Sequence, residues 1–301
     1  MKSKTLLIIN IILVYSITFP FSLTFNLGNN NDSKVFNNFT MDNITLRTSN
    51  ITSPIHIKGN SGWVNFKNAG GCIGNGTYSD PYIIEDLIID GYWNYNCVLV
   101  ENSNVYFKIE NCTLRYGRSE GWWLEDGAGI YLINVINAQL INNSFYSNNC
   151  GIILLYSNYS IISGNIVRDS TSSDSGISLS HSNDNYISRN ILRNNEGVAL
   201  YLSRSNNNLI LENSLILDRY MWYTSTLLYL RLSNNNSIIG NTFINHYDSC
   251  WVERDCEGNV FINNYCNLYV NALARINIFI FCLISIISII SIIKLTTKRK
   301  R

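Results

Sequence analysis

The residues of this chain that could carry chemistry are carboxylates, aromatic side chains and arginines between positions 120 and 250. Glycoside hydrolysis requires two carboxyl groups placed across the scissile bond. The acidic residues here are instead scattered along the sequence: Glu125, Asp126, Asp169, Asp174, Glu196, Asp218 and Asp248. None belongs to a motif typical of a hydrolase, lyase or epimerase. We therefore predict no catalytic residue and interpret most of these acids as solvated turn charges.

Metal chemistry finds no support in the pattern either. A transition-metal site needs His, Met or Cys side chains that cluster. The three histidines, His56, His181 and His246, are far apart, and the three methionines form no group. The sequence therefore predicts no metal site and no cofactor.

Two aromatic-rich segments remain as candidate binding residues, and short polar segments lie between them. Aromatic rings cover the apolar faces of sugars, while charged groups bind their hydroxyls. The candidate ligand-binding residues are Trp122, Trp123, Arg168, Asp169, Arg193, Glu196, Tyr220, Trp222 and Tyr223. Two interpretations stay open: these residues form a groove for a glycan or a partner, or the aromatic rings fold back as a local core.

A repeat of 22–32 residues must position these side chains. The segments GIILLYSNYSIISGNIV, GISLSHSNDNYISRNIL and ALYLSRSNNNLILENSL, from Gly151, Gly176 and Ala199, share one template of alternating apolar residues. One position of the template is asparagine in seven successive coils: Asn111, Asn143, Asn165, Asn190, Asn213, Asn241 and Asn264. A unit this short, with two short strands and polar turns, buries its apolar residues only by stacking on its neighbours. The pattern predicts an all-β, parallel β-solenoid of about seven to eight coils.

The asparagine column has a structural interpretation. Stacked at about 4.8 Å per coil, identical amides accept a hydrogen bond from one neighbour and donate one to the next. Such a ladder satisfies the polar groups of a buried turn without charge. The two aromatic segments, 112–128 and 214–226, are enlarged loops that follow the asparagine in their coils, so both emerge at one corner.

The segment GNGTYSDPYIIEDLIIDG, from Gly74 to Gly91, and the repeats after it resemble the NosD-like right-handed parallel β-helix proteins. That group is related to carbohydrate-binding and sugar-hydrolase β-helices. The resemblance covers roughly Ile55 to Asn267. It implies a right-handed solenoid, a first strand at Tyr82 and an Asp86 that occupies the asparagine column. Members include surface proteins of no assigned activity, so the resemblance alone implies no function.

The two ends of the sequence predict a secreted, membrane-anchored chain. Lys2 and Lys4 precede an apolar run, as in a signal peptide over residues 1–22, with an uncleaved signal anchor as the alternative. Residues 276–293 carry no charge, and the basic tail 295–301 follows, which favours a transmembrane helix over 272–294 with the tail in the cytoplasm. A buried helix is the alternative. Between the ends we predict a polar lead-in over 23–54, rich in glycosylation sequons, and a β-helix ectodomain over 55–271.

Charge and cysteine content limit the possible partners and indicate the compartment of the chain. Eight of the 22 basic residues lie at the two ends, so 14 remain against all 21 acidic residues and the middle carries −7, which argues against a nucleic-acid partner. Eight cysteines indicate an oxidising compartment. We expect a disulfide between Cys250 or Cys256 and Cys266 near the end of the solenoid, and at least one free or intermolecular thiol.

These observations predict a cell-surface β-helix protein with a recognition or structural role, which binds carbohydrate or a surface partner. The first alternative is an enzyme acting on polysaccharide, a lyase, hydrolase or epimerase, that uses acids of the aromatic-walled face. The second is an accessory subunit that docks another membrane protein.

Overall fold

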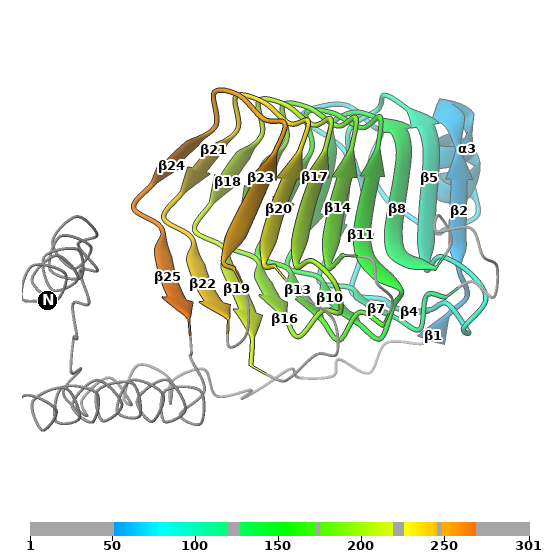
Figure 1. Ribbon diagram of the computed structural model, residues 1–301. Coiled ribbons are helices and arrows are strands. Elements are labelled where there is room, and N and C mark those ends of the chain that lie inside the picture. Colours follow the sequence, from blue (N-terminus) through cyan, green and yellow to red (C-terminus); the bar gives the residue numbers. More distant parts are fainter. Residues whose placement is uncertain (1–50, 119–126, 172–174, 219–225, 246–248, 269–301) are drawn as a thin grey trace, which may run out of the picture. The chain divides into compact units, whose positions relative to one another are not determined.

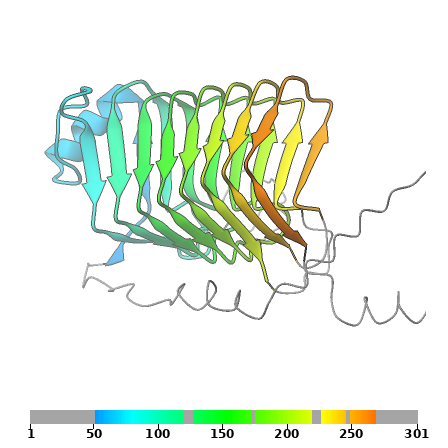
Figure 2. The same ribbon diagram turned by 90° about the vertical axis from the view of Figure 1, so that its left-hand side faces the viewer.

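The computed structural model describes residues 51–118, 127–171, 175–218, 226–245 and 249–268. These residues form a parallel β-solenoid of about seven turns, as predicted (Figures 1 and 2). Each turn contributes one strand to each of three parallel sheets, which we call sheets A, B and C. The apolar core lies between the three sheets and runs along the solenoid.

The strands of each sheet are hydrogen-bonded in the order of the turns. Sheet A contains β1 (Ile51–Thr52), β4 (Ile88–Asp90), β7 (Thr113–Arg115), β10 (Ser144–Tyr146), β13 (Ile166–Arg168), β16 (Ile191–Arg193), β19 (Ser214–Leu217), β22 (Thr242–Asn245) and β25 (Tyr265–Leu268). Sheet B contains β2 (Ile55–Lys58), β5 (Val98–Ser103), β8 (Ala128–Val135), β11 (Cys150–Leu155), β14 (Ile177–Ser180), β17 (Leu200–Ser203), β20 (Leu228–Arg231) and β23 (Trp251–Arg254). Sheet C contains β3 (Tyr82–Glu85), β6 (Phe107–Glu110), β9 (Ala138–Ile141), β12 (Ile161–Ser163), β15 (Tyr186–Ser188), β18 (Leu209–Leu211), β21 (Ser237–Ile239) and β24 (Val260–Ile262).

The repeat predicts two strands per turn, and this prediction is wrong because each turn has three. The sequence pattern does not reveal the strands of sheet A, because most of them have three residues and only the central residue faces the core. In β13, for example, Val167 is fully buried while Ile166 and Arg168 are partly exposed. A single inward residue gives no period-two alternation that a sequence pattern can detect.

The asparagine column is a hydrogen-bonded ladder inside the solenoid. The side-chain oxygen of Asn190 accepts from the backbone N–H and from Nδ2 of Asn165, at 2.9 and 3.0 Å. Nδ2 of Asn190 donates to Asn213 in the next turn and to the carbonyl of Ile162, both at 2.9 Å. The same arrangement links the members of the file: Asn143, Asn165, Asn190, Asn213, Asn241 and Asn264. Each amide therefore satisfies buried backbone groups of two turns.

The prediction that Asn111 is the first member of the asparagine column is wrong by one residue. The register of β6 and β9 places Cys112 beneath Asn143, and the N–H of Cys112 donates to the Asn143 side chain at 2.9 Å. Asn111 lies one position earlier, exposed and in the left-handed backbone region at φ 53°. The corner between β5 and β6 has one residue more than the equivalent corner between β8 and β9, which shifts the fixed spacing. Asp86 pairs in register with Asn111, at φ 56°, and so is also outside the ladder.

A second amide ladder lies at the corner between sheets B and C. The N–H of Asn185 donates to the side chain of Asn208 at 2.9 Å, and the next two turns continue the file with Asn236 and Asn259. A file of serines precedes it, in which the N–H of Ser182 donates to Oγ of Ser205 at 3.1 Å. The first asparagine of the S-N-x-N corner forms a third file, in which the N–H of Asn206 donates to the Asn183 side chain at 2.7 Å. Each of the three polar positions of this corner is therefore stacked from turn to turn.

A helix closes the N-terminal end of the solenoid, which the sequence did not predict. Helix α3 (Gly59–Asn68) lies against β2 and β5 at this end (Figure 1). Its residue Trp63 is 0% exposed, stacks on Tyr82 at 5.4 Å between ring centroids and contacts Phe107 at 4.5 Å. Trp63 Nε1 also donates to Oγ of Ser103 at 3.1 Å. The apolar core is thereby covered at this end.

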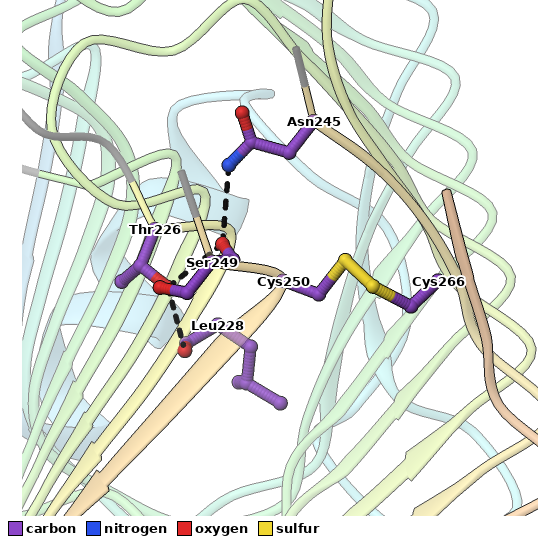
Figure 3. The surroundings of a disulfide bond; sticks show 6 residues. All are labelled: Thr226, Leu228, Asn245, Ser249, Cys250 and Cys266. Carbon is purple, nitrogen blue, oxygen red and sulfur yellow. Dashed lines mark hydrogen bonds between the residues drawn. A yellow bond between two sulfur atoms is a disulfide. The ribbon is translucent and has the colours of Figure 1, made fainter. Parts of the chain in front are cut away.

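The predicted disulfide at the C-terminal end is present and joins Cys250 to Cys266 (Figure 3). It connects the start of β23 to β25 and so closes the last turn upon itself. Cys256 carries a free thiol. Beside the bridge, the carbonyl of Ser249 accepts from Thr226 Oγ1 at 3.2 Å and from Asn245 Nδ2 at 3.1 Å (Figure 3).

The predicted signal peptide, most of the lead-in, the transmembrane helix and the basic tail fall outside the described residues. Within the described ranges, no helix is long and apolar enough to cross a membrane. The membrane prediction for residues 272–294 is thus not tested by the structure.

Two buried thiols give a prediction about reactivity. Desolvation by burial raises the pKa of Cys97 and of Cys112 to about 12. At pH 8 only about one such thiol in ten thousand is the reactive thiolate. We expect iodoacetamide to modify the partly exposed Cys256 and to leave Cys97 and Cys112 unmodified until the protein is unfolded in denaturant, as measured by peptide mass mapping. Rapid native modification of Cys97 or Cys112 would contradict this placement.

Candidate binding face on sheet A

The outer face of sheet A carries a row of charged and aromatic side chains, which we call the sheet A face. In β7, β10, β13 and β16 the central residue points into the core, so the third residue of each strand points outward. The paired registers place these third residues in one file, which begins with Asp90 of β4. The file is Asp90, Arg115, Tyr146, Arg168 and Arg193.

Adjacent side chains in this file contact one another. Arg115 Nε lies 3.0 Å from a carboxylate oxygen of Asp90, and its Nη1 donates to the Tyr146 hydroxyl at 3.1 Å. The hydrogen bond that Arg115 donates to Tyr146, and then the one that it donates to Asp90, raise the pKa of Arg115 above its ordinary value despite partial burial. On the other side of the same ring, the Arg168 guanidinium carbon lies 5.2 Å from the Tyr146 centroid. Tyr146 is thus contacted by an arginine from each direction along the file.

A second row of aromatic residues flanks the file at the next corner. Tyr116 follows Arg115 in the left-handed backbone region, at φ 57°. Its ring lies 4.4 Å from that of Trp93 and 5.8 Å from that of Tyr146. The Arg118 guanidinium stacks on Trp93 at 4.4 Å. Aromatic rings and guanidinium groups therefore form one continuous cluster over several turns.

Two arginines of this cluster have a donor that no group satisfies. Nε of Arg118 and Nε of Arg168 are both buried without a hydrogen-bond partner among the described residues. Nη1 of Arg168 makes only a long contact with Asp169, at 3.4 Å. A buried donor without an acceptor is costly in a folded protein. The Nε atoms themselves are shielded from solvent, so an anionic or hydroxyl ligand would meet the accessible part of these two partly exposed arginine side chains.

The carboxylates of the face lie beside arginines. Arg193 makes an ion pair with Asp218, and the backbone N–H of Asp218 donates to the Asn194 side chain at 3.1 Å. Burial raises the pKa of Asp218, but the hydrogen bonds from Arg193 and Asn194 outweigh it, so the pKa lies below its ordinary value. Asp218 is therefore ionised at neutral pH and unsuited to donate a proton.

The structure brings part of the predicted candidate set together. Arg168, Asp169 and Arg193 lie in neighbouring turns on the sheet A face, and exposed Glu196 lies at the following corner. The predicted aromatic residues lie outside the described residues: Trp122, Trp123, Tyr220, Trp222 and Tyr223. The described cluster is instead built from residues that the sequence reasoning did not single out: Asp90, Trp93, Arg115, Tyr116, Arg118 and Tyr146.

A sequence signal for these residues exists. Each of three turns contains N-x-Φ-R or N-x-Φ-Y, where Φ is apolar, at Asn143–Tyr146, Asn165–Arg168 and Asn190–Arg193. In a solenoid, a residue type that repeats at one template position forms a file on the surface. No group of three His, Cys, Asp or Glu side chains able to hold a metal ion occurs within the described part of the chain.

Parallel strands stacked in three sheets around one apolar core define the class of β-helices. Residues 55–243 match the family described as "Right handed beta helix region", and the chain belongs to this family. The finer resemblance to NosD-like proteins stays a prediction. No curated protein matches the sequence.

Solved structures match part of the chain at low sequence identity. A variant of the periplasmic alginate epimerase AlgG is 17% identical, with a TM-score of 0.45 over 62% of this chain and 50% of that one. A structure named glycoside hydrolase is 13% identical, with a TM-score of 0.42 over 64% and 39%. The A-module of the Azotobacter vinelandii mannuronan C-5 epimerase AlgE6 is 15% identical, with a TM-score of 0.34 over 62% of each chain. The chain thus spans about half the length of AlgG, and likeness at this level says nothing about activity.

Proposed function

We propose that this chain is a membrane-anchored surface protein whose sheet A face binds an acidic carbohydrate. One observation carries the proposal: Arg118 and Arg168 are partly exposed, and their guanidinium groups lie on aromatic rings in one surface cluster. Aromatic rings pack on the apolar faces of sugar rings, and guanidinium groups bind carboxylates through paired hydrogen bonds. The ligand class that needs both is an acidic polysaccharide.

The repeat supports a polymeric ligand. Arg168 and Arg193 are direct register partners in neighbouring strands, so their backbones lie about 4.8 Å apart along the solenoid. This spacing is comparable to the length of one sugar unit in a chain. A polymer that lies along sheet A would therefore meet an equivalent side chain at each turn.

Binding is favoured over hydrolysis by the electrostatics of the face. A general acid needs a pKa raised toward neutrality. The pKa of Asp218 is shifted in the opposite direction by Arg193, and Asp90 and Asp169 also lie beside arginines. Asp218 is therefore unsuited to act as the proton donor of the enzyme alternative. Docking to another membrane protein is the remaining alternative role.

The membrane part of the proposal rests on the sequence of the two ends. We propose a cleaved signal peptide, a span over residues 272–294 and a cytoplasmic basic tail, which place the solenoid outside the cell. The sequons of the lead-in, the predicted glycosylation and the disulfide between Cys250 and Cys266 suit that compartment.

The test is a titration of the full chain, in detergent micelles, with a polyuronate and with neutral dextran. We expect the polyuronate alone to bind, and Arg168→Gln to weaken it by about 10–100-fold, because a hydrogen bond to a charged group contributes about 1.5–3 kcal/mol. Arg189→Gln is the matched control, since Arg189 pairs with exposed Glu212 at the corner that precedes the sheet A strands, whereas Arg168 lies at the other end of its strand.

Equal affinity of the Arg168→Gln variant and the parent would overturn the proposal, as would equal binding of dextran. New reducing ends in the same mixtures would favour the hydrolase alternative, and co-purification with a second membrane protein would favour the docking role.

A further inference from the structure

The two ends of the solenoid differ in how their cores are covered. Helix α3 covers the N-terminal end, where Trp63 is fully buried. At the C-terminal end the last strands β23 and β24 have no further partner strand among the described residues, and β25 likewise ends sheet A (Figure 2). Large apolar side chains are exposed there, with Val260 at 47%, Ile262 at 44% and Tyr265 at 57%.

The exposed side chains of the last turn are divided by type. The carboxylates Glu253, Asp255 and Glu257 lie in and after β23, at the corner toward β24. The apolar residues Val260, Ile262 and Tyr265 lie on β24 and β25. The corner after β23 therefore carries three carboxylates, with Arg254 beside Asp255. Apolar and aromatic side chains are exposed on β24, on β25 and at the start of β23, where Trp251 is 36% and Val252 38% exposed.

A further copy of the solenoid is a poor occupant of this end. The inward file of sheet B reads Ile57, Val100, Leu132, Leu154, Leu179, Leu202, Leu230 and then Glu253. Glu253 is exposed and accepts a hydrogen bond from Asn259 Nδ2 at 2.7 Å. Another turn stacked upon it would bury this carboxylate in the file of aliphatic side chains, which is costly.

The chain that follows indicates a different occupant. Three residues, 269–271, separate β25 from the proposed span over 272–294. An extended chain covers at most about 3.6 Å per residue, so the end of β25 stays within about 15 Å of the bilayer. Tyrosine and aliphatic side chains are favoured at the lipid interface, whereas carboxylates are not.

We infer that the C-terminal end of the solenoid lies on the surface of the lipid bilayer through β24 and β25, with the acidic corner after β23 turned to water. The inference rests on the proposed membrane anchor and adds an orientation: the solenoid stands up from the membrane with α3 at its far end. The sheet A face then runs away from the cell surface, accessible along its length to an external polymer.

The experiment uses nitroxide spin labels on the full chain in phosphatidylcholine nanodiscs. The background is Cys256→Ser with Cys282→Ser, and serine suits position 256 because Ser233 and Ser205 occupy the same file. The free cysteines that remain, Cys72, Cys97, Cys112 and Cys150, are buried. One exposed cysteine is then added in β24 by Ile262→Cys or Val260→Cys, or at the far end by Asn68→Cys. Power saturation compares collisions with oxygen, which concentrates in lipid, and with a water-soluble nickel chelate.

We expect the oxygen-to-nickel collision ratio to be several-fold higher at positions 262 and 260 than at 68. A label on unmutated Cys256, at the acidic corner, should behave like the label at 68. Equal ratios at 262, 260 and 68 in a chain that remains in the nanodisc would overturn the orientation alone. A chain absent from the nanodisc fraction would overturn the anchor together with the orientation. Labels shielded from both reagents, in particles that hold two chains, would show that this end binds a second copy of the chain. That result would also overturn the proposed orientation.

Discussion

Replacing Asn190 by alanine is expected to cost about 4 kcal/mol of unfolding free energy, although the substitution removes only a small side chain. Asn190 is fully buried and bonds to Asn165, Asn213 and Ile162 at 2.9–3.0 Å. Alanine leaves the N–H of Asn165 and the carbonyl of Ile162 without these partners, and each unsatisfied buried group costs about 1–3 kcal/mol. Urea unfolding followed by circular dichroism measures the loss.

Two further variants separate hydrogen bonding from packing in the ladder. Asn190→Asp keeps the shape and the acceptor oxygen but removes the amide donor and buries a carboxylate, so we expect it to be at least as destabilising. Asn207→Gly is the control in the same turn, because Asn207 is exposed at φ 56°, a conformation that glycine adopts without strain. A loss below about 1 kcal/mol for Asn190→Ala would show that the amides stack without stabilising the fold.

The ladder also explains how much of the fold the sequence reveals. Asn143, Asn165 and Asn190 could be aligned without a structure because a solenoid stacks equivalent template positions on one another. Asn111 could not be placed by the same rule. The extra residue in the corner before Phe107 changes the spacing without changing the composition, and only the strand register of β6 shows the shift.

Helix α3 was missed for a different physical reason. Its segment, Gly59–Asn68, contains two glycines and three asparagines, which are weak helix formers. The helix is stabilised by burial of Trp63 against the open end of the core, a tertiary interaction that no local pattern contains. The single disulfide was predictable in part, because Cys250 and Cys266 lie in one turn, but the choice between Cys250 and Cys256 required the strand positions.

The candidate site was the least predictable part. The sequence indicates the aromatic residues of the enlarged loops as candidates, and those residues, within 119–126 and 219–225, lie outside the described residues. The described cluster arises because Tyr146 and Arg168 fall at the same position of neighbouring sheet A strands. Their relation became visible only when the third strand of each turn was known, since its single inward residue leaves no alternating pattern.

The second large effect is expected at the N-terminal end, where Trp63→Ala should remove about 3–5 kcal/mol of stability. The indole ring is 0% exposed, stacks on Tyr82 and contacts Phe107, so its removal leaves a cavity between α3 and the first turns. In a solenoid each turn is stabilised chiefly by its neighbours, so the loss should appear first as faster hydrogen exchange in β2 and β5.

The controls for this prediction are Trp63→Phe and Trp93→Ala. Phenylalanine keeps a ring against Tyr82 and loses only the hydrogen bond to Ser103 and part of the buried area, so we expect a loss of about 1–2 kcal/mol. Trp93 is 44% exposed on the sheet A face, so its removal should change stability by less than about 1 kcal/mol while weakening polyuronate binding. If Trp63→Ala changed stability no more than Trp93→Ala, burial of Trp63 under the helix would not be needed to stabilise the end of the core. We therefore expect Trp63 to act on stability and Trp93 on binding. The end of the solenoid exposes its apolar core unless a residue such as Trp63 covers it, whereas the hydrogen bonds along the sides are already made between stacked strands.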